Sequence, residues 1–334
     1  MKWVTHITFS VIISTFICCS SDNDGELTPN CPSFGFEIVL SSPYSDPIWH
    51  PSGDIIGFNY LPLDSINYKF GYDCPLQAEY KFRNQSAGFY LIDSNGKNQR
   101  RALSYFVYDP AWSPDGKWLA FSDQNGTIFK IAFDGNEFDE TSLCQLTQGG
   151  RFWDVAWSYD GQHIAYNNRI AVNDTFGIWV SLSSQLSQSQ YFSYGGKSSW
   201  SNSSNTIYYA KDNSYWSKAW TEGMEKKIFD YSNYNFQSID HPSLSGESIL
   251  FDGFVVSDDK TGRGLWLLDL KRPALNEIKS DAFSGSWGPT DKIVYVNFNF
   301  QRIDTIQGTI WIMDRDGSNA QQLTYHKNLE IIMH

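Results

Sequence analysis

The stretch Asp109-Pro-Ala-Trp-Ser-Pro-Asp-Gly-Lys-Trp-Leu-Ala-Phe121 decides the fold, because its first half returns along the whole chain. The other copies begin at Asp46, Asp154, Lys197, His241 and Ser284. Measured between the Trp or Leu at their centres, the six copies are 63, 45, 43, 44 and 43 residues apart. One four-stranded propeller blade takes about 40–50 residues. The repeat therefore predicts an all-β fold, a six-bladed β-propeller of four-stranded antiparallel blades.

The residue at the centre of each copy is expected to be core. These anchors are Trp49, Trp112, Trp157, Trp200, Leu244 and Trp287. Large aromatics that recur once per blade fill the space between neighbouring sheets. Each anchor precedes a turn sequence such as Pro-Asp-Gly, in which Pro presets φ and Gly tolerates a positive φ. Strands are therefore predicted on both sides of the turn, as at Trp118 to Ser122 and Lys292 to Asn297.

The first blade contains an insertion. The interval of 63 residues exceeds the others, and the surplus falls in Leu61 to Gln85, between the second and third strands. A connection this long inside a compact repeat is commonly functional. Two further segments look like spare strands, Phe36 to Leu40 and Leu329 to Met333. Either one could complete blade six and close the ring, and the sequence does not choose between them.

The repeats resemble the TolB-type propeller repeat, which is built on Trp-Ser-Pro-Asp-Gly. Blade two shows the pattern from Pro110 through Thr147, and blade six shows it from Trp287 through Thr324. The resemblance covers about residues 35–334 and implies a TolB-like six-bladed propeller. It implies no particular activity, since one fold hosts many functions.

The N-terminus reads as a targeting segment. Lys2 is followed by an apolar stretch, Val4 to Ile17, that is too short to span a bilayer. The sequence Phe16-Ile-Cys-Cys19 resembles a bacterial lipoprotein signal with Cys19 as the lipidated residue. The acidic run after Cys19 resembles the export tag of Bacteroidetes surface lipoproteins. An ordinary secretory signal is the alternative.

This interpretation divides the chain into three parts. Residues 1–18 are the signal peptide, residues 19–34 a flexible tether and residues 35–334 the propeller. The expected location is the bacterial outer membrane, to which the lipid alone attaches the protein. The sequence does not decide whether the protein faces the periplasm or the cell surface.

The remaining cysteines point to one disulfide. Disulfides persist in exported proteins. Cys31 and Cys74 both lie in loop-like contexts, and we predict that they pair. Cys144 lies in a strand-like stretch and is expected to be a free, buried thiol. Three cysteines leave one over, so counting alone cannot prove the pair.

The candidate site is a ring of residues three positions before each anchor. These are Asp46, Asp109, Asp154, Lys197, His241 and Ser284. Equivalent positions on the innermost strands of a propeller surround its central channel. One residue earlier stand the aromatics Tyr108, Trp153 and Phe283. Together they predict a ligand site at the channel mouth.

Three interpretations of this ring stay open. Aromatic faces and carboxylates suit a sugar, which stacks its apolar face and donates its hydroxyls. Carboxylates also suit a divalent cation, the one cofactor that the sequence allows for. The structural alternative is that each Asp bonds to nearby backbone and fixes the entry into the strand. A histidine metal site built from His50, His163, His241 and His326 is a further possibility.

Charge and motifs narrow the function. The net charge of -12 is unfavourable for nucleic-acid binding, which needs clustered Lys and Arg. The sequence contains no Gly-x-Ser-x-Gly or His-Glu-x-x-His motif. We therefore expect a non-catalytic binding or scaffold module, monomeric, whose partner is a glycan or an envelope protein. The alternative is a polysaccharide lyase or hydrolase that uses the channel carboxylates with His241.

Overall fold

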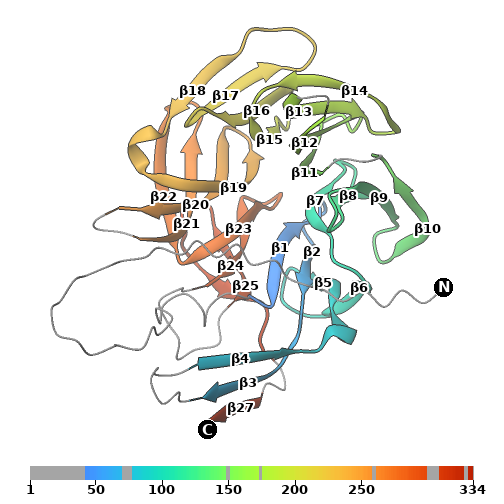
Figure 1. Ribbon diagram of the computed structural model, residues 1–334, viewed down its shortest axis with the longest axis vertical. Coiled ribbons are helices and arrows are strands. Elements are labelled where there is room, and N and C mark those ends of the chain that lie inside the picture. The colour runs from blue at the N-terminus through green and yellow to red at the C-terminus, as the bar shows by residue number, and fades with distance from the viewer. Residues whose placement is uncertain are drawn as a thin grey trace, which may run out of the picture.

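The computed structural model describes residues 42–69, 77–147, 151–172, 175–257, 261–298, 308–326 and 330–333. Six four-stranded antiparallel sheets surround a central axis as the blades of a propeller (Figure 1), which confirms the predicted fold. Cys19, Cys31 and Cys74, and with them the signal, the tether and the disulfide, lie outside the described residues. Among the residues described, no helix has the length and apolar character needed to cross a bilayer.

The first three blades follow one another along the chain. Blade one contains β1 (Tyr44–Trp49), β2 (Ile55–Tyr60), β5 (Gly88–Asp93) and β6 (Arg100–Leu103). Blade two contains β7 (Tyr108–Trp112), β8 (Trp118–Ser122), β9 (Ile128–Phe133) and β10 (Phe138–Gln145). Blade three contains β11 (Phe152–Trp157), β12 (His163–Val172), β13 (Thr175–Leu182) and β14 (Gln185–Ser193).

The other three blades repeat this order. Blade four contains β15 (Gly196–Trp200), β16 (Thr206–Lys211), β17 (Ser214–Ala219) and β18 (Lys226–Asp230). Blade five contains β19 (Phe236–Ser245), β20 (Ser248–Val256), β21 (Thr261–Asp269) and β22 (Ala274–Ser280). Blade six contains β23 (Ala282–Trp287), β24 (Lys292–Asn297), β25 (Thr309–Asp314) and β26 (Gln321–Gln322). The first strand of each blade lies next to the axis.

Within the part of the chain that the structure describes, blades one and six are each built from their own four consecutive blade strands. Trp49 and Tyr44 of β1 pack in one apolar cluster with Val294 and Ile310 of blade six. The spare strand near the C-terminus does not complete blade six. It is β27 (Glu330–Met333), which pairs in parallel with β3 (Leu63–Lys69) of the insertion.

The insertion and the C-terminal strand thus form a separate sheet, ordered β27-β3-β4, with β4 at Gln77–Phe82. This sheet lies beside blades one and six, outside the ring (Figure 1). The other spare segment, Phe36 to Leu40, lies outside the described residues.

The anchors pack as predicted. Trp49, Trp112, Trp200, Leu244 and Trp287 are buried. Trp157 is half-buried and donates its indole N–H to the Ala111 carbonyl of the preceding blade at 2.9 Å. Each anchor therefore contributes to the packing of its blade against the rest of the ring.

The prediction for Cys144 was wrong in one respect. Its thiol is free, as expected, but it is exposed rather than buried. Cys144 lies on β10, the outermost strand of blade two, where no neighbouring sheet covers the side chains. The apolar residues of its surrounding sequence had suggested packing that an edge strand does not have.

Candidate functional site

The innermost strands share a backbone irregularity at the predicted ring. In β1, β7, β11, β15, β19 and β23 the pairing with the next strand shifts at this point. Five ring residues have left-handed backbones, with φ of 51° at Asp46, 47° at Asp109, 55° at Asp154, 54° at Lys197 and 50° at Ser284. Asp tolerates this conformation better than most residues, because its short side chain bonds locally. A bulge of this kind re-aims the side chain that it carries.

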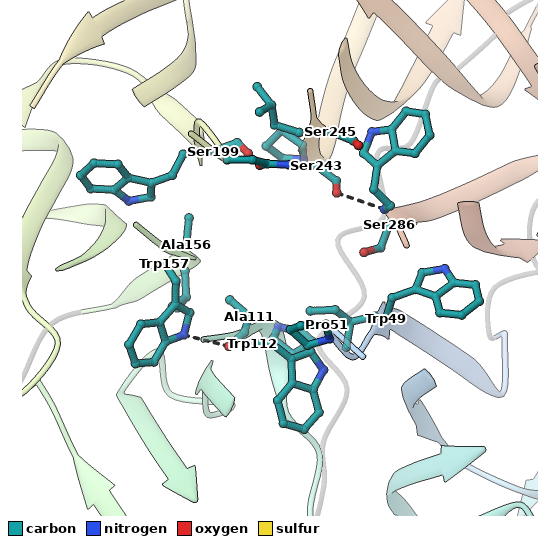
Figure 2. Close-up of a pocket in the computed structure, with 18 of the residues that line it drawn as sticks. Trp49, Pro51, Ala111, Trp112, Ala156, Trp157, Ser199, Ser243, Ser245 and Ser286 are labelled. Carbon is teal, nitrogen blue, oxygen red and sulfur yellow. Dashed lines mark hydrogen bonds between the residues drawn. The ribbon is translucent and has the colours of Figure 1, made fainter. Parts of the chain in front are cut away.

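The inner strands enclose a cavity of about 510 Å³, lined by all six blades. Small side chains such as Ala111, Ala156 and Ser199 surround it, while the rings of Trp112 and Trp157 point away from it (Figure 2). The wall is therefore made largely of backbone and short side chains.

The cavity has two distinct ends. At the bulge end it is lined by Asp46, Asp109, Asp154 and Ser284. At the turn end it is lined by the residues that follow the anchors, Pro51, Pro114, Tyr159, Asn202 and Pro289. Among the lining residues described, the carboxylates of the bulge end are the acidic groups, so this end repels anions.

The wall also has two faces. Blades one to three line it with apolar residues such as Ile48, Ala111 and Val155. Blades four to six line it with hydroxyls from Ser198, Ser199, Ser201, Ser243, Ser245, Ser284 and Ser286. The buried Ser198 hydroxyl has no hydrogen-bond partner among the described residues. A buried hydroxyl without a partner is costly, and a polar ligand would relieve that cost.

Lys197 holds two carboxylates together at the bulge end. Its Nζ lies 3.0 Å from Oδ1 of Asp154 and 2.6 Å from Oδ1 of Asp240. The other oxygen of Asp154 accepts a hydrogen bond from Asn167 Nδ2 at 2.9 Å. Since Asp154 is buried, this geometry is what compensates the removal of its charge from water.

Arg263 extends these contacts across blade five. Its Nη2 lies 3.6 Å from Asp240 Oδ2, and its Nη1 lies 3.4 Å from Asp252 Oδ2. Asp252 is fully buried, and its Oδ1 accepts a hydrogen bond from the Ser284 backbone N–H at 3.2 Å. We call the five side chains Asp154, Lys197, Asp240, Arg263 and Asp252 the charge chain. It alternates in sign from blade three to blade five, and Asp252 connects it to the backbone of blade six.

Asp109 and Asp46 join the remaining blades. Asp109 Oδ2 accepts a hydrogen bond from the Asp154 backbone N–H at 3.2 Å. Asp46 Oδ2 accepts hydrogen bonds from Ser45 Oγ at 2.7 Å and from Asn59 Nδ2 at 2.9 Å. Asn59 in turn bonds both backbone groups of Val107, at the entry to blade two. The contact of Asp109 with backbone is of the kind that the structural alternative predicted, whereas these contacts of Asp46 are with side chains.

The predicted aromatics divide into two groups. Tyr108 and Trp153 lie edge to face with their ring centroids 6.3 Å apart, next to Asp109 and Asp154 in the chain. Burial raises the pKa of Tyr108, and the charge of Asp46 raises it further, so this phenol stays protonated. Phe283 instead packs against Phe298, with their centroids 5.9 Å apart.

His241 lies in β19, and its side chain is outside the described part of the structure. His50 bridges two blades, since Nε2 lies 3.0 Å from the Gly116 carbonyl and Nδ1 lies 2.9 Å from Ser52 Oγ. His163 stacks on Trp200 in another part of the ring. Within the described residues, no three His, Cys, Asp or Glu side chains are placed to hold a metal ion.

Sequence reasoning missed three members of the charge chain, Asp240, Asp252 and Arg263. Asp252 and Arg263 come from β20 and β21, which carry no motif, and Asp240 precedes the copy of the repeat that lacks Trp. A usable signal was present, because blade five departs most from the repeat and carries these charges in its strands.

Comparison with solved structures gives other propellers. The chain is similar to TolB from Acinetobacter baumannii, with a TM-score of 0.37 and 15% identity over 83% of this chain and 53% of that one. It is also similar to the β-propeller domain of the Trilobed protease from Pyrococcus furiosus, with a TM-score of 0.47 and 13% identity over 85% and 98%. An oligogalacturonate lyase in complex with manganese gives a TM-score of 0.47 and 10% identity over 84% and 76%.

These similarities concern the fold alone. The chain spans about half the length of TolB, 53%, and 54% of the Pyrococcus horikoshii acylaminoacyl peptidase that it also resembles. Neither the protein-family models nor the curated proteins gave a match. The function must therefore be argued from the site.

Proposed function

We propose that this chain is an exported bacterial lipoprotein whose propeller binds a carbohydrate at the bulge end of its channel, without catalysis. The observation that carries the proposal is the charge chain, whose Asp154 directly follows Trp153 in β11, together with the contact between the Trp153 and Tyr108 rings. Donors and acceptors held in fixed positions next to aromatic rings suit a ligand that has hydroxyls on its edges and C–H groups on its faces.

The charges favour a neutral ligand over an ionic one. The two cations of the charge chain, Lys197 and Arg263, are both engaged with carboxylates. An anionic ligand would have to compete with those carboxylates and approach Asp46 and Asp109 as well. Hydroxyl groups can add hydrogen bonds to such a network without breaking it.

The same contacts speak against proton transfer. General acid–base catalysis by two carboxyl groups needs environments that push their pKa values apart. Asp154 is paired with Lys197 and Asn167, and Asp109 accepts the Asp154 N–H. Each contact stabilises the charged form of its carboxylate. A lyase or hydrolase that uses these carboxylates is the competing function.

Binding is tested on a glycan array with the purified protein, in calcium and in chelator. We expect a hit that is weakened in Tyr108→Ala and kept in Tyr159→Ala. Tyr159 is an exposed tyrosine at the turn end and serves as the matched control. Loss in chelator would add a cation to the site. An array without any hit would refute carbohydrate binding. Cleavage of a glycan that binds would instead support the lyase or hydrolase.

Lipidation is tested separately in a bacterial host that processes lipoproteins. The wild-type protein should take up radiolabelled palmitate and fractionate with membranes, and Cys19→Ala should do neither. Label retained in Cys19→Ala would show that Cys19 is not the acceptor.

A further inference from the structure

Three large aromatic side chains are exposed on blade three and on the link that follows it. Phe176 and Tyr191 come from β13 and β14 of blade three, and Tyr194 follows β14 directly. Their exposed fractions are 50%, 45% and 57%. Most other large aromatics of the described residues lie in the clusters between blades. We call Tyr191 and Tyr194 the tyrosine pair.

Tyr191 is held in place from below. Its ring meets Trp179 edge to face, with the centroids 5.6 Å apart and the planes at 73°. It also covers Gly177, where a Cβ atom would lie 3.1 Å from Tyr191 Cε2. The ring is therefore supported on one side and open to solvent on the other, as a stacking surface needs to be.

An ion pair of blade four lies next to the tyrosine pair. Lys211 Nζ and Glu225 Oε2 are 2.6 Å apart, and Glu225 Oε1 accepts a hydrogen bond from Ser193 Oγ. Ser193 stands between Tyr191 and Tyr194 in the chain. Charged donors and acceptors thus accompany the exposed rings, which is the same combination found at the bulge end.

A short, tightly packed segment joins the two places. Tyr194 and Lys197 are separated by two glycines, so their backbones are at most about 10 Å apart. A Cβ atom on Gly195 would lie 2.6 Å from the Ala210 carbonyl oxygen, and one on Gly196 would lie 2.8 Å from Asn167 Nδ2. Asn167 is the residue that bonds Asp154. The segment therefore runs close against its neighbours, from the charge chain to the tyrosine pair.

We infer that the carbohydrate is an extended chain, which runs from the bulge end over the tyrosine pair of blades three and four. This inference rests on the proposed function and adds a second subsite to it. The bulge end takes one unit through the charge chain and Tyr108. The tyrosine pair stacks further units of the same chain, with Lys211 and Glu225 beside them.

The test is binding of cello-, xylo- and malto-oligosaccharide ladders by calorimetry. For the series that binds, affinity should rise with length in the wild type. In Tyr194→Ala the affinity for long members should fall about tenfold, which corresponds to about 1.4 kcal/mol and lies within the range for stacking on an aromatic ring. The shortest member that binds should be unaffected. Tyr159→Ala is the control, since Tyr159 is exposed at 42% and lies at the turn end of the channel, away from the proposed path of the chain.

The outcomes separate the two proposals. If the wild type binds no ladder, the proposed function fails and the inference fails with it. If short and long members bind equally, or if Tyr194→Ala and Tyr159→Ala behave alike, the inference alone is refuted. Thermal melting of each variant checks that it is folded. Replacing an exposed tyrosine by Ala should not lower the melting temperature.

Discussion

Replacement of Lys197 should lower the stability of the propeller, because this residue connects neighbouring blades. Its ammonium lies between Asp154 and Asp240 and thereby links blades three, four and five. Lys197→Met keeps the length of the unbranched stem and the left-handed backbone, with φ of 54°, but removes the charge. Asp154, which is buried, then loses its cation.

The magnitude follows from burial. Breaking a fully buried ion pair costs about 3–5 kcal/mol, because the remaining charge is left uncompensated. The side chains of Lys197 and Asp240 are 20% and 25% exposed, so water recovers part of the loss. We therefore expect a loss of about 2–4 kcal/mol in the free energy of unfolding. At about 2 °C per kcal/mol for a large domain, the melting temperature should fall by about 4–8 °C.

The assay is urea denaturation together with thermal melting, followed by tryptophan fluorescence and circular dichroism. Lys227→Met is the matched control. Its Nζ lies 2.6 Å from Asp230, the same distance as in the pair of Lys197 with Asp240, but both side chains are about half exposed. Exposed pairs of this kind contribute little. A double variant with Asp154→Asn should recover part of the stability, because no buried charge is then left alone.

The reasoning is refuted if Lys197→Met melts within error of Lys227→Met. It is also refuted if the double variant is as unstable as the sum of its single variants. Either result would mean that the charge chain is not coupled across the blades.

Three further results are expected from packing, pH and deletion. Trp112→Ala should lose about 3–5 kcal/mol in urea denaturation, since Trp112 is buried against Phe133 and Phe138, and a smaller loss would contradict its role as core. Burial pushes the pKa of Glu225 up, but hydrogen bonds from Lys211 and others overcome this and lower it to about 2, below the 4.5 of a free carboxyl. The stability gained from this carboxylate is present above about pH 4.5 and is lost as the pH falls towards 2. The difference in melting temperature between wild type and Glu225→Gln should therefore narrow over that range. A difference that stays constant with pH would show that ionised Glu225 does not stabilise the fold in this way. Deletion of residues 330–333 should speed hydrogen exchange in β3, which pairs with β27. The melting temperature of the propeller should stay unchanged, because blade six has its own four strands. A lower melting temperature would show that β27 helps to close the ring.

The repeat was enough to predict most of the fold. Trp118 to Ser122 and Lys292 to Asn297 are strands with the predicted bounds, because a turn sequence and an anchor mark their ends. Prediction was wrong at the outer strand of blade two, where no anchor exists. The outer strand of blade two is β10, Phe138–Gln145, and its edge position leaves Cys144 exposed where a buried thiol was predicted.

The candidate site was predictable only in part. Position within the repeat was enough to bring Asp46, Asp109 and Asp154 to one end of the channel. It could not reveal the partners of these residues, which depend on side chains from the second and third strands. Asp252 and Arg263 meet because β20 and β21 are neighbours in blade five, and nothing periodic marks either residue.

The position three residues before each anchor is constrained both by the backbone and by the site. A left-handed backbone costs most residues about 1–2 kcal/mol, and Asp reduces this by bonding locally. Asp at positions 46, 109 and 154 therefore has a backbone reason to be there, whatever the channel binds. Lys197 has none, and its two ion pairs are what offset the strain. Those pairs lead into blade five, the blade whose anchor is Leu244 instead of Trp. The residues that follow the repeat build the propeller. Lys197 and the charges of blade five, which depart from it, join Asp154 in the charge chain on which the proposed site depends.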